Sequence, residues 1–231
     1  MTGIHLQYRI IDAAVAAGVK RYFPTEFGLN DLPDWLVELR PMFRIKHDVR
    51  DYLVTKEKDG LEWTSIVCNV FFEMGIMNGF FGFYWGVGEG VDGKKKNKAV
   101  VVDGGDVKWV ATTLDTVAVA VVRSIERADK TRNKLLLVQD FRTSQRELLE
   151  RLKQKAGEDA WEVEDVKYNE WLEGAKERVR GGDNSALGIL TFGTVLLGSK
   201  WEERPEYGNG LLDLPTRSFE DAIQTVLKDI S

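Results

Sequence analysis

From Gln7 to Gly28 the chain reads QYRIIDAAVAAGVKRYFPTEFG, and this stretch decides the fold. Apolar residues recur at helical spacing over residues 4–17, which predicts an amphipathic helix. Gly18 follows, at the position where a glycine commonly ends a helix. Residues 21–24 then form a short β-prone run that a proline stops. A helix that leads directly into a short strand is the second half of a βαβ unit, so the stretch predicts a parallel sheet.

The same order of helix and strand recurs further along the chain. We expect a helix over residues 44–56 and a buried strand over 63–69, then a helix over 116–127 and a strand over 135–139. Alternation of this kind is typical of α/β proteins with a parallel sheet. The strand that should precede the first helix has no room ahead of residue 4, so we expect the sheet to be N-terminally incomplete.

The other segments give more local predictions. The glycine- and aromatic-rich residues 80–93 are interpreted as a loop. Residues 99–102 and 107–111 are expected to form a hairpin around the turn at 103–106. Asp115 is the expected N-cap of the helix that follows it. Three more helices are expected, the first and last of them opened by capping patterns at Ser144 and Ser218: 144–155, 165–180 and 218–228.

Composition excludes several classes of protein. The 231 residues carry a formal net charge of −5, whereas nucleic-acid binders usually show a basic surplus. The one basic run, Lys94 to Lys96, is interpreted as a solvated turn. Cys68 is the only cysteine, so no internal disulfide can form, and a metal site built on thiolates is excluded. No metal ligand is therefore assigned.

Neither a membrane span nor a secretory signal is expected. The most apolar stretch, residues 67–91, contains several polar residues and many glycines, which a stable spanning helix would not carry. The first residues lack the basic head and apolar core of a signal peptide. Together with the single cysteine, these features favour a cytoplasmic protein in a reducing compartment.

Residues 7–28 resemble the isoflavone reductase-like or NmrA-like family of atypical short-chain dehydrogenases. That family has a glutamine, an Ile-Asp-Ala-Ala helix and Gly-Val-Lys-Arg, followed by Pro-Ser-Glu-Phe-Gly; here the last motif is Pro-Thr-Glu-Phe-Gly at 24–28. Residues 43–50 resemble the family's Lys-x-x-Val-Arg helix, and residues 63–71 resemble the strand end that carries its Asn-x-Phe. The resemblance implies a Rossmann-like parallel sheet with a smaller α/β substrate-binding region.

By this resemblance Lys46 is the catalytic residue, and the cofactor is NADPH. A lysine that is partly desolvated beside a cofactor has a lowered pKa and can exchange a proton near neutral pH. Taken without the resemblance, Lys46 would be an ordinary exposed helix lysine, and a solvated helix face explains the pair Lys46 and Arg50 equally well. Met42 stands where many short-chain reductases have a tyrosine, and the family lacks that tyrosine too.

The residues expected to bind the cofactor follow two strands. Ligands of open α/β sheets bind at the carboxyl ends of strands, and the resemblance assigns cofactor binding to residues at two such ends as well as to the lysine: Pro24, Thr25, Glu26, Phe27, Lys46, Asn69 and Phe71. A phenylalanine after a buried strand is more often a core residue, so the alternative for Phe71 is a place in the core.

Glycines in the order Gly88-x-Gly90-x-x-Gly93 match the dinucleotide fingerprint only in their letters. They follow no compact strand, and no helix opens after them to offer its N-terminus to a pyrophosphate. We interpret them as a loop near the substrate. The family's true glycine loop would precede Gln7, so the resemblance covers only the later part of the family's length.

Residues 1–80 are expected to be the remainder of the dinucleotide-binding domain, and residues 81–231 a mixed substrate-binding region that returns to the sheet. The resulting function is an NADPH-dependent oxidoreductase acting on a small, secondary-metabolite substrate. The alternatives are a dinucleotide-sensing regulator of the NmrA type and an inactive truncated homologue. An apolar edge near Ile10, Ala14 and Val19 predicts a homo-oligomer or another partner chain. Nucleic acid and membrane are not expected partners.

Overall fold

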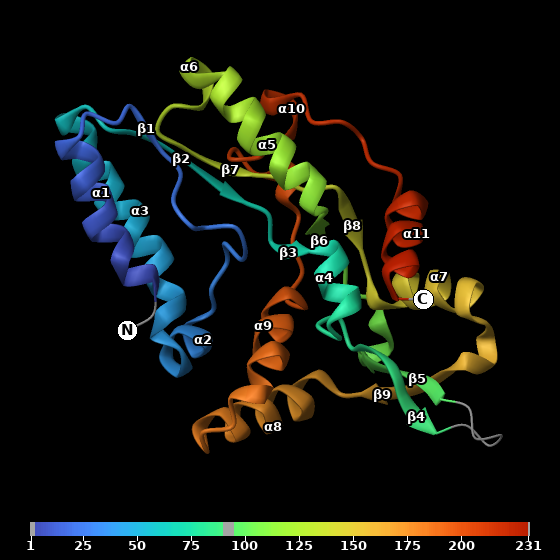
Figure 1. The fold of residues 1–231 in the computed structure, drawn as a ribbon. Helices are drawn as coiled ribbons and strands as arrows, with labels where there is room; N and C mark the ends of the chain where they lie inside the picture. The colour runs from blue at the N-terminus through green and yellow to red at the C-terminus, as the bar shows by residue number, and fades with distance from the viewer. Residues whose placement is uncertain (1–2, 90–94, 231) are drawn as a thin grey trace. The chain divides into compact units, whose positions relative to one another are not determined.

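The computed structural model describes residues 3–89 and 95–230 (Figure 1). The chain divides into two compact units. Unit 1 comprises Met1–Asn69, Asp115–Gln139 and Trp201–Pro215, and unit 2 comprises Val70–Leu114, Asp140–Lys200 and Thr216–Ser231. The chain therefore passes between the units several times. No helix in the described part of the chain is long and apolar enough to cross a membrane.

Unit 1 is built on a parallel sheet with the strand order β1-β2-β7. Its strands are β1 (Arg21–Tyr22), β2 (Glu62–Val67) and β7 (Lys134–Leu137), with Arg21 in register with Glu62 and Thr64 with Lys134. The α-helices of this unit are α1 (Leu6–Ala16), α2 (Asp34–Leu39), α3 (Arg44–Lys56), α5 (Leu114–Glu126, all but its first residue), α6 (Ala128–Thr131) and α10 (Asn209–Leu212). Short 3-10 turns are η1 (Gly3–His5), η2 (Pro41–Phe43), η3 (Glu57–Asp59) and η7 (Trp201–Glu203). The predicted α/β class with a parallel sheet is confirmed.

The apolar faces of α1 and α3 pack together against the start of β2 (Figure 1). Ile45, Val49 and Leu53 lie four residues apart, so they project from one side of α3, and all three are buried. Burying a side chain of this size stabilises the fold by about 1.5–3 kcal/mol. On the expected apolar edge, Ile10 is 53% exposed and Val19 is 41% exposed, whereas Ala14 belongs to the core.

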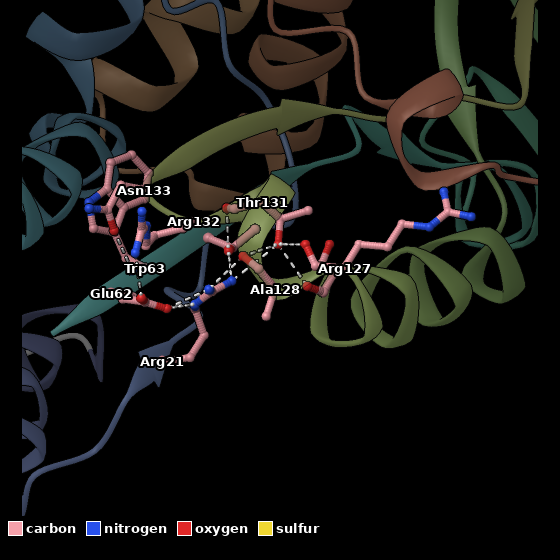
Figure 2. A network of polar contacts seen from close by, with 10 residues as sticks. Arg21, Glu62, Trp63, Arg127, Ala128, Thr131, Arg132 and Asn133 are labelled. Atoms are coloured by element: carbon pink, nitrogen blue, oxygen red, sulfur yellow. Dashed lines mark hydrogen bonds and ion pairs between the residues drawn. The ribbon is translucent and has the colours of Figure 1, made fainter.

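A polar network at the amino ends of β1 and β2, which we call the Arg21 network, holds this end of the sheet (Figure 2). The Arg21 guanidinium donates from Nε to Glu62 at 3.1 Å, from Nη1 to Thr64 at 3.0 Å and to Thr131 at 3.1 Å, and from Nη2 to the carbonyl of Ala128 at 2.8 Å. One side chain therefore links two strands and α6. Conserving the charge alone would not keep this geometry, because the planar guanidinium supplies several donors in fixed directions.

Unit 2 contains two further three-stranded sheets. The first has the order β3-β6-β8, with β3 (Val70–Phe71), β6 (Trp109–Thr112) and β8 (Phe141–Thr143). The second has the order β4-β5-β9, with β4 (Phe83–Glu89), β5 (Lys95–Val102) and β9 (Trp161–Val166). The α-helices are α4 (Phe72–Met77), α7 (Gln145–Ala156), α8 (Tyr168–Arg180), α9 (Leu187–Val195) and α11 (Phe219–Ile230), and 3-10 turns are η4 (Asp103–Gly105), η5 (Glu158–Ala160) and η6 (Asn184–Ala186).

Two predictions for unit 2 are wrong. Residues 83–89 form a strand rather than part of a loop, because the glycines before it serve close packing: a Cβ at Gly82 would lie 2.4 Å from the carbonyl oxygen of Val100. The expected hairpin at 99–111 does not form. Strand β5 pairs instead with β4 and β9, while β6 pairs with β3 and β8. Gly90, Gly93 and Lys94, which the glycine pattern and the basic run included, lie outside the described residues.

Helix starts were predicted with mixed success. The Ser144 hydroxyl accepts a hydrogen bond from the backbone N–H of Glu147, as the capping pattern predicts, and Ser218 does the same for Asp221. Asp115, the expected N-cap, lies inside the first turn of α5, so that prediction is wrong by position. Helix α8 begins at Tyr168 because the residues before it belong to β9.

Candidate functional site

The segments that follow β1 and β2 lie at the same edge of the parallel sheet in unit 1, the edge where α/β proteins bind ligands. They are joined by a hydrogen bond of 2.9 Å from the backbone N–H of Asn69 to the carbonyl oxygen of Gly28. Asn69 has a positive φ of 56°, a conformation that asparagine tolerates better than most residues. The chain therefore turns sharply here, directly after the buried end of β2.

A buried carboxylate occupies this edge. Glu26 is fully buried, and Arg50 on α3 donates to it from Nε at 3.2 and 3.0 Å and from Nη2 at 2.9 Å. The Ser65 hydroxyl on β2 also donates to Glu26. We call Glu26, Arg50 and Ser65 the Glu26 cluster. Burial raises the pKa of Glu26 above its ordinary value, and Arg50 and then Lys46 act in the opposite direction. A buried charge needs such partners to be tolerated.

Lys46 lies one helical turn before Arg50 on α3, and its ammonium group lies over the backbone of Gly28. A Cβ at Gly28 would be 3.1 Å from Lys46 Nζ, so the glycine leaves the space that the ammonium fills. Burial lowers the pKa of Lys46, while Glu26 and Cys68 oppose this shift. Among residues 3–89 and 95–230, Lys46 Nζ has no hydrogen-bond or ion-pair partner.

The buried thiol of Cys68 stays protonated. Burial raises its pKa to about 12, and the nearby Lys46 only partly offsets this effect. A thiol in this state is a small apolar group rather than a nucleophile or a metal ligand. The chemistry available at this edge is thus proton exchange by the lysine.

The remaining predicted site residues are distributed around the same loop, with one exception. Pro24 is buried, Thr25 is exposed and Phe27 is half-buried, while Asn69 is buried at the end of β2. Phe71 belongs to β3 in unit 2, so its part in a cofactor site stays a prediction. The structure therefore brings Glu26, Lys46 and Asn69 together around Gly28.

Two interpretations of α3 are now corrected. Arg50 does not form a solvated face with Lys46, because its side chain is only 17% exposed and is paired with a buried carboxylate. Lys46 is not an ordinary exposed helix lysine, because it is partly buried and lies against Gly28.

Four residues of this region were not predicted as site residues: Gln7, Gly28, Arg50 and Ser65. Gln7 is 3% exposed, and its Oε1 accepts a hydrogen bond of 2.7 Å from the backbone N–H of Thr25. Its Nε2 is a buried donor with no acceptor in the described part of the chain. The sequence signals for them were that Gln7 and Gly28 begin and end the first stretch resembling the family, and that Arg50 ends the motif at 43–50. Ser65 had no such signal.

Known proteins resemble this chain both in sequence and in fold. A family model described as the NmrA-like family matches residues 1–170. A curated relative, Oxidoreductase aprR of Aspergillus flavus, is 31% identical over 229 residues, covering 97% of this chain and 73% of the relative. The prediction of an oxidoreductase agrees with that name.

Solved structures resemble the fold. An isoflavone reductase has a TM-score of 0.68 at 21% identity, and the match covers 95% of this chain and 70% of the reductase. The complex of leucoanthocyanidin reductase with NADPH from Vitis vinifera has a TM-score of 0.67 at 19% identity, covering 98% of this chain and 72% of the reductase. The predicted Rossmann-like fold class is confirmed.

Proposed function

The chain belongs to the NmrA-like family, and we propose that it is an NADPH-dependent oxidoreductase that reduces a small molecule with Lys46 as proton donor or acceptor. The observation that carries this proposal is the position of Lys46 Nζ. It lies over Gly28, beside the ends of β1 and β2, where it has no partner among the described residues.

The donors of this edge suit a dinucleotide. Gln7 Nε2 and Lys46 Nζ both lack an acceptor within the described residues, and ribose hydroxyls and a carboxamide are rich in acceptors. In this proposal the cofactor contacts in unit 1 are residues predicted from the sequence, Pro24, Thr25, Phe27, Lys46 and Asn69, with Gln7 added. Glu26 belongs to the same loop, but both of its oxygens are already occupied.

The reaction divides between the cofactor and the chain. A bound NADPH would supply the hydride. Lys46 holds the proton that the reduced substrate requires, and it gives this proton to the substrate atom that becomes negative. Because burial lowers the pKa of Lys46, the ammonium releases its proton more readily near neutral pH than a free lysine does.

The proposal for the substrate rests on the glycine- and aromatic-rich composition of residues 80–93. We propose that residues 81–231 recognise the substrate and that this substrate is an aromatic or polyketide-like secondary metabolite. The name of the curated relative, an oxidoreductase, gives no substrate, and the name of the Vitis vinifera leucoanthocyanidin reductase applies to that protein alone. A cytoplasmic location remains part of the same proposal, based on the single buried cysteine.

The test is oxidation of NADPH by the purified 231-residue chain, followed by absorbance in the presence of a panel of aromatic ketones, enones and benzylic ethers. Lys46→Met keeps the apolar stem and removes the ammonium group. Lys58→Met, at an exposed position in η3, is the matched control. We expect turnover with at least one compound, lost in Lys46→Met and kept in Lys58→Met.

Two results would contradict the proposal. Equal turnover in Lys46→Met and wild type would remove the lysine from the chemistry. Saturable NADPH binding without turnover of any compound, at the same affinity in both proteins, would favour the dinucleotide-sensing regulator instead.

A further inference from the structure

We propose that Glu26 is the positioning residue of Lys46: its buried carboxylate, fixed by Arg50 and Ser65, holds the Lys46 ammonium over Gly28 at the carboxyl edge of the sheet. The inference rests on the proposed function for the chemistry that Lys46 performs. It assigns Glu26 a role through Lys46 instead of through contact with substrate or cofactor.

The position of Glu26 is set by partners from two elements. Arg50 from α3 reaches both carboxylate oxygens, and Ser65 from β2 donates to one of them. Arg50 can only donate, so both carboxylate oxygens accept hydrogen bonds from a cation, an arrangement that favours the ionised form against the effect of burial. A carboxylate held from a helix and a strand at once cannot follow Lys46 if the lysine moves. The negative charge of Glu26 therefore keeps one position and attracts the ammonium group toward it.

The lysine, by contrast, lacks a direct bond that would hold it. Its Nζ fills the space above Gly28, two residues after Glu26, and it lies one helical turn before Arg50, which binds Glu26. Against the larger lowering effect of burial, Glu26 and then Cys68 among the described groups raise the pKa of Lys46. Arg50 is engaged with Glu26, and the neighbouring His47 turns away, with its Nε2 3.1 Å from the carbonyl oxygen of Asn30.

The two acidic partners are not equivalent. Burial keeps the Cys68 thiol protonated far above neutral pH, so it contributes no charge under physiological conditions. Asp51 acts on Glu26, whose pKa it raises slightly, and it is not among the groups that act on Lys46. Glu26 is thus the negative charge that keeps Lys46 protonated and in place against the effect of burial.

The experiment measures the pKa of the Lys46 amine directly. Lysines of the full chain are dimethylated with ¹³C-formaldehyde, the Lys46 signal is assigned by its absence in Lys46→Arg, and its chemical shift is followed against pH without NADPH. In Glu26→Gln the pKa of Lys46 should fall by about one unit or more, because an opposite charge nearby typically shifts a pKa by one to three units. Glu62→Gln, which alters the arginine–glutamate pair at the opposite end of the sheet, should leave the pKa of Lys46 unchanged.

A second variant protects the test against misfolding. Glu26→Gln alone leaves Arg50 without its counter-charge, whereas Glu26→Gln with Arg50→Met removes both charges, a change that buried pairs often tolerate. The pKa of Lys46 should fall in the double variant as well. An unchanged Lys46 pKa in a folded single or double variant would overturn the inference.

The same measurement separates this inference from the proposed function. A lowered Lys46 pKa in a chain that does not oxidise NADPH would leave the positioning role intact and defeat the reductase. An active reductase whose Lys46 pKa is indifferent to Glu26 would do the reverse. In an active enzyme, the limb of the pH–rate profile that Lys46 controls should also move to lower pH in Glu26→Gln.

Discussion

Two of the arginine–glutamate pairs in unit 1, Arg21–Glu62 and Arg50–Glu26, use the same chemistry at opposite ends of the sheet. Arg21 and Glu62 lie at the amino ends of β1 and β2, where the Glu62 side chain is 32% exposed (Figure 2). Arg50 and Glu26 lie at the carboxyl ends, where the Glu26 side chain is fully buried. The pKa of Glu62 is lowered, chiefly by its hydrogen bond to Arg21, whereas burial raises the pKa of Glu26.

This difference teaches that the partner alone does not decide the role of a charged side chain. In the Arg21 network every guanidinium donor that is described ends on a strand or helix of the fold, so the network is a structural link. The Glu26 cluster contains one cation, Arg50, and has a second cation beside it, Lys46, which no direct bond neutralises within the described residues. A pair with an additional unmatched charge is the one that can perform chemistry.

The largest expected effect separates the two ends by function. Lys46→Met should lower kcat by about 10²- to 10⁴-fold, the usual contribution of a general acid or base. Arg21→Met removes a cation from the opposite end and should leave kcat unchanged while lowering stability. Steady-state rates on any compound that is turned over provide the comparison, and an equal loss of kcat in both variants would show that the two ends are not distinct.

Stability should separate the two pairs next. Glu26→Ala leaves Arg50 buried without its counter-charge and should lower the free energy of unfolding by about 3–5 kcal/mol. Glu62→Ala removes a carboxylate that is 32% exposed, and Arg21, although itself only 13% exposed, keeps its acceptors on Thr64, Thr131 and Ala128. The cost should therefore be at most about 1 kcal/mol after solvent screening. Urea unfolding of both variants measures the difference. Similar losses would mean that burial does not distinguish the pairs.

A weaker effect of opposite sign should appear with pH. The lowered pKa of Glu62 means that its stabilising contribution is present above its ordinary value of 4.5 and is lost as the pH falls through the folded-state value. The raised pKa of Glu26 means that the folded state binds more protons than the unfolded chain, so its contribution declines as the pH rises above 4.5. Stability curves of Glu62→Gln and Glu26→Gln, each subtracted from wild type, should slope in opposite directions. Parallel difference curves would contradict this assignment.

The smallest effect concerns Gly28. Gly28→Ala places a methyl group 3.1 Å from Lys46 Nζ, the flexible end of that side chain, and it also strains the backbone, because Gly28 has a φ of 157° that residues with a Cβ rarely adopt. We expect roughly a tenfold loss of kcat or less from this small displacement, with the fold intact by circular dichroism. Gly60→Ala is the control, because Gly60 also has a positive φ, 85°, and a Cβ there meets nothing within 4 Å. Unchanged kcat in Gly28→Ala would show that the position of Lys46 over Gly28 is not critical.

The helices and strands could be predicted from the sequence more completely than the site. Helix α3 begins and ends where its periodicity predicts, because Ile45, Val49 and Leu53 mark one face. Strand β4 was missed because glycine is usually a loop signal, and its close packing against Val100 depends on a segment eighteen residues away in the chain.

The contacts at the centre of the site could not be predicted from the sequence, because they join residues that are distant in the chain. Lys46 and Glu26 were found through the family motifs, but neither motif shows that Arg50 and Ser65 converge on one carboxylate. These residues lie 24 and 39 positions from Glu26, a separation that no helical or strand spacing connects. Composition and periodicity therefore could not distinguish a buried cluster from a solvated face.

The most direct test of the account is binding of NADPH to the purified chain, followed by nicotinamide fluorescence and compared with Gln7→Met and Lys46→Met. The account predicts saturable binding that each substitution weakens, roughly tenfold for the loss of one hydrogen bond to a polar ligand. A folded chain that shows no binding up to millimolar NADPH, or binding that neither substitution affects, would contradict a cofactor site at the carboxyl edge of β1 and β2.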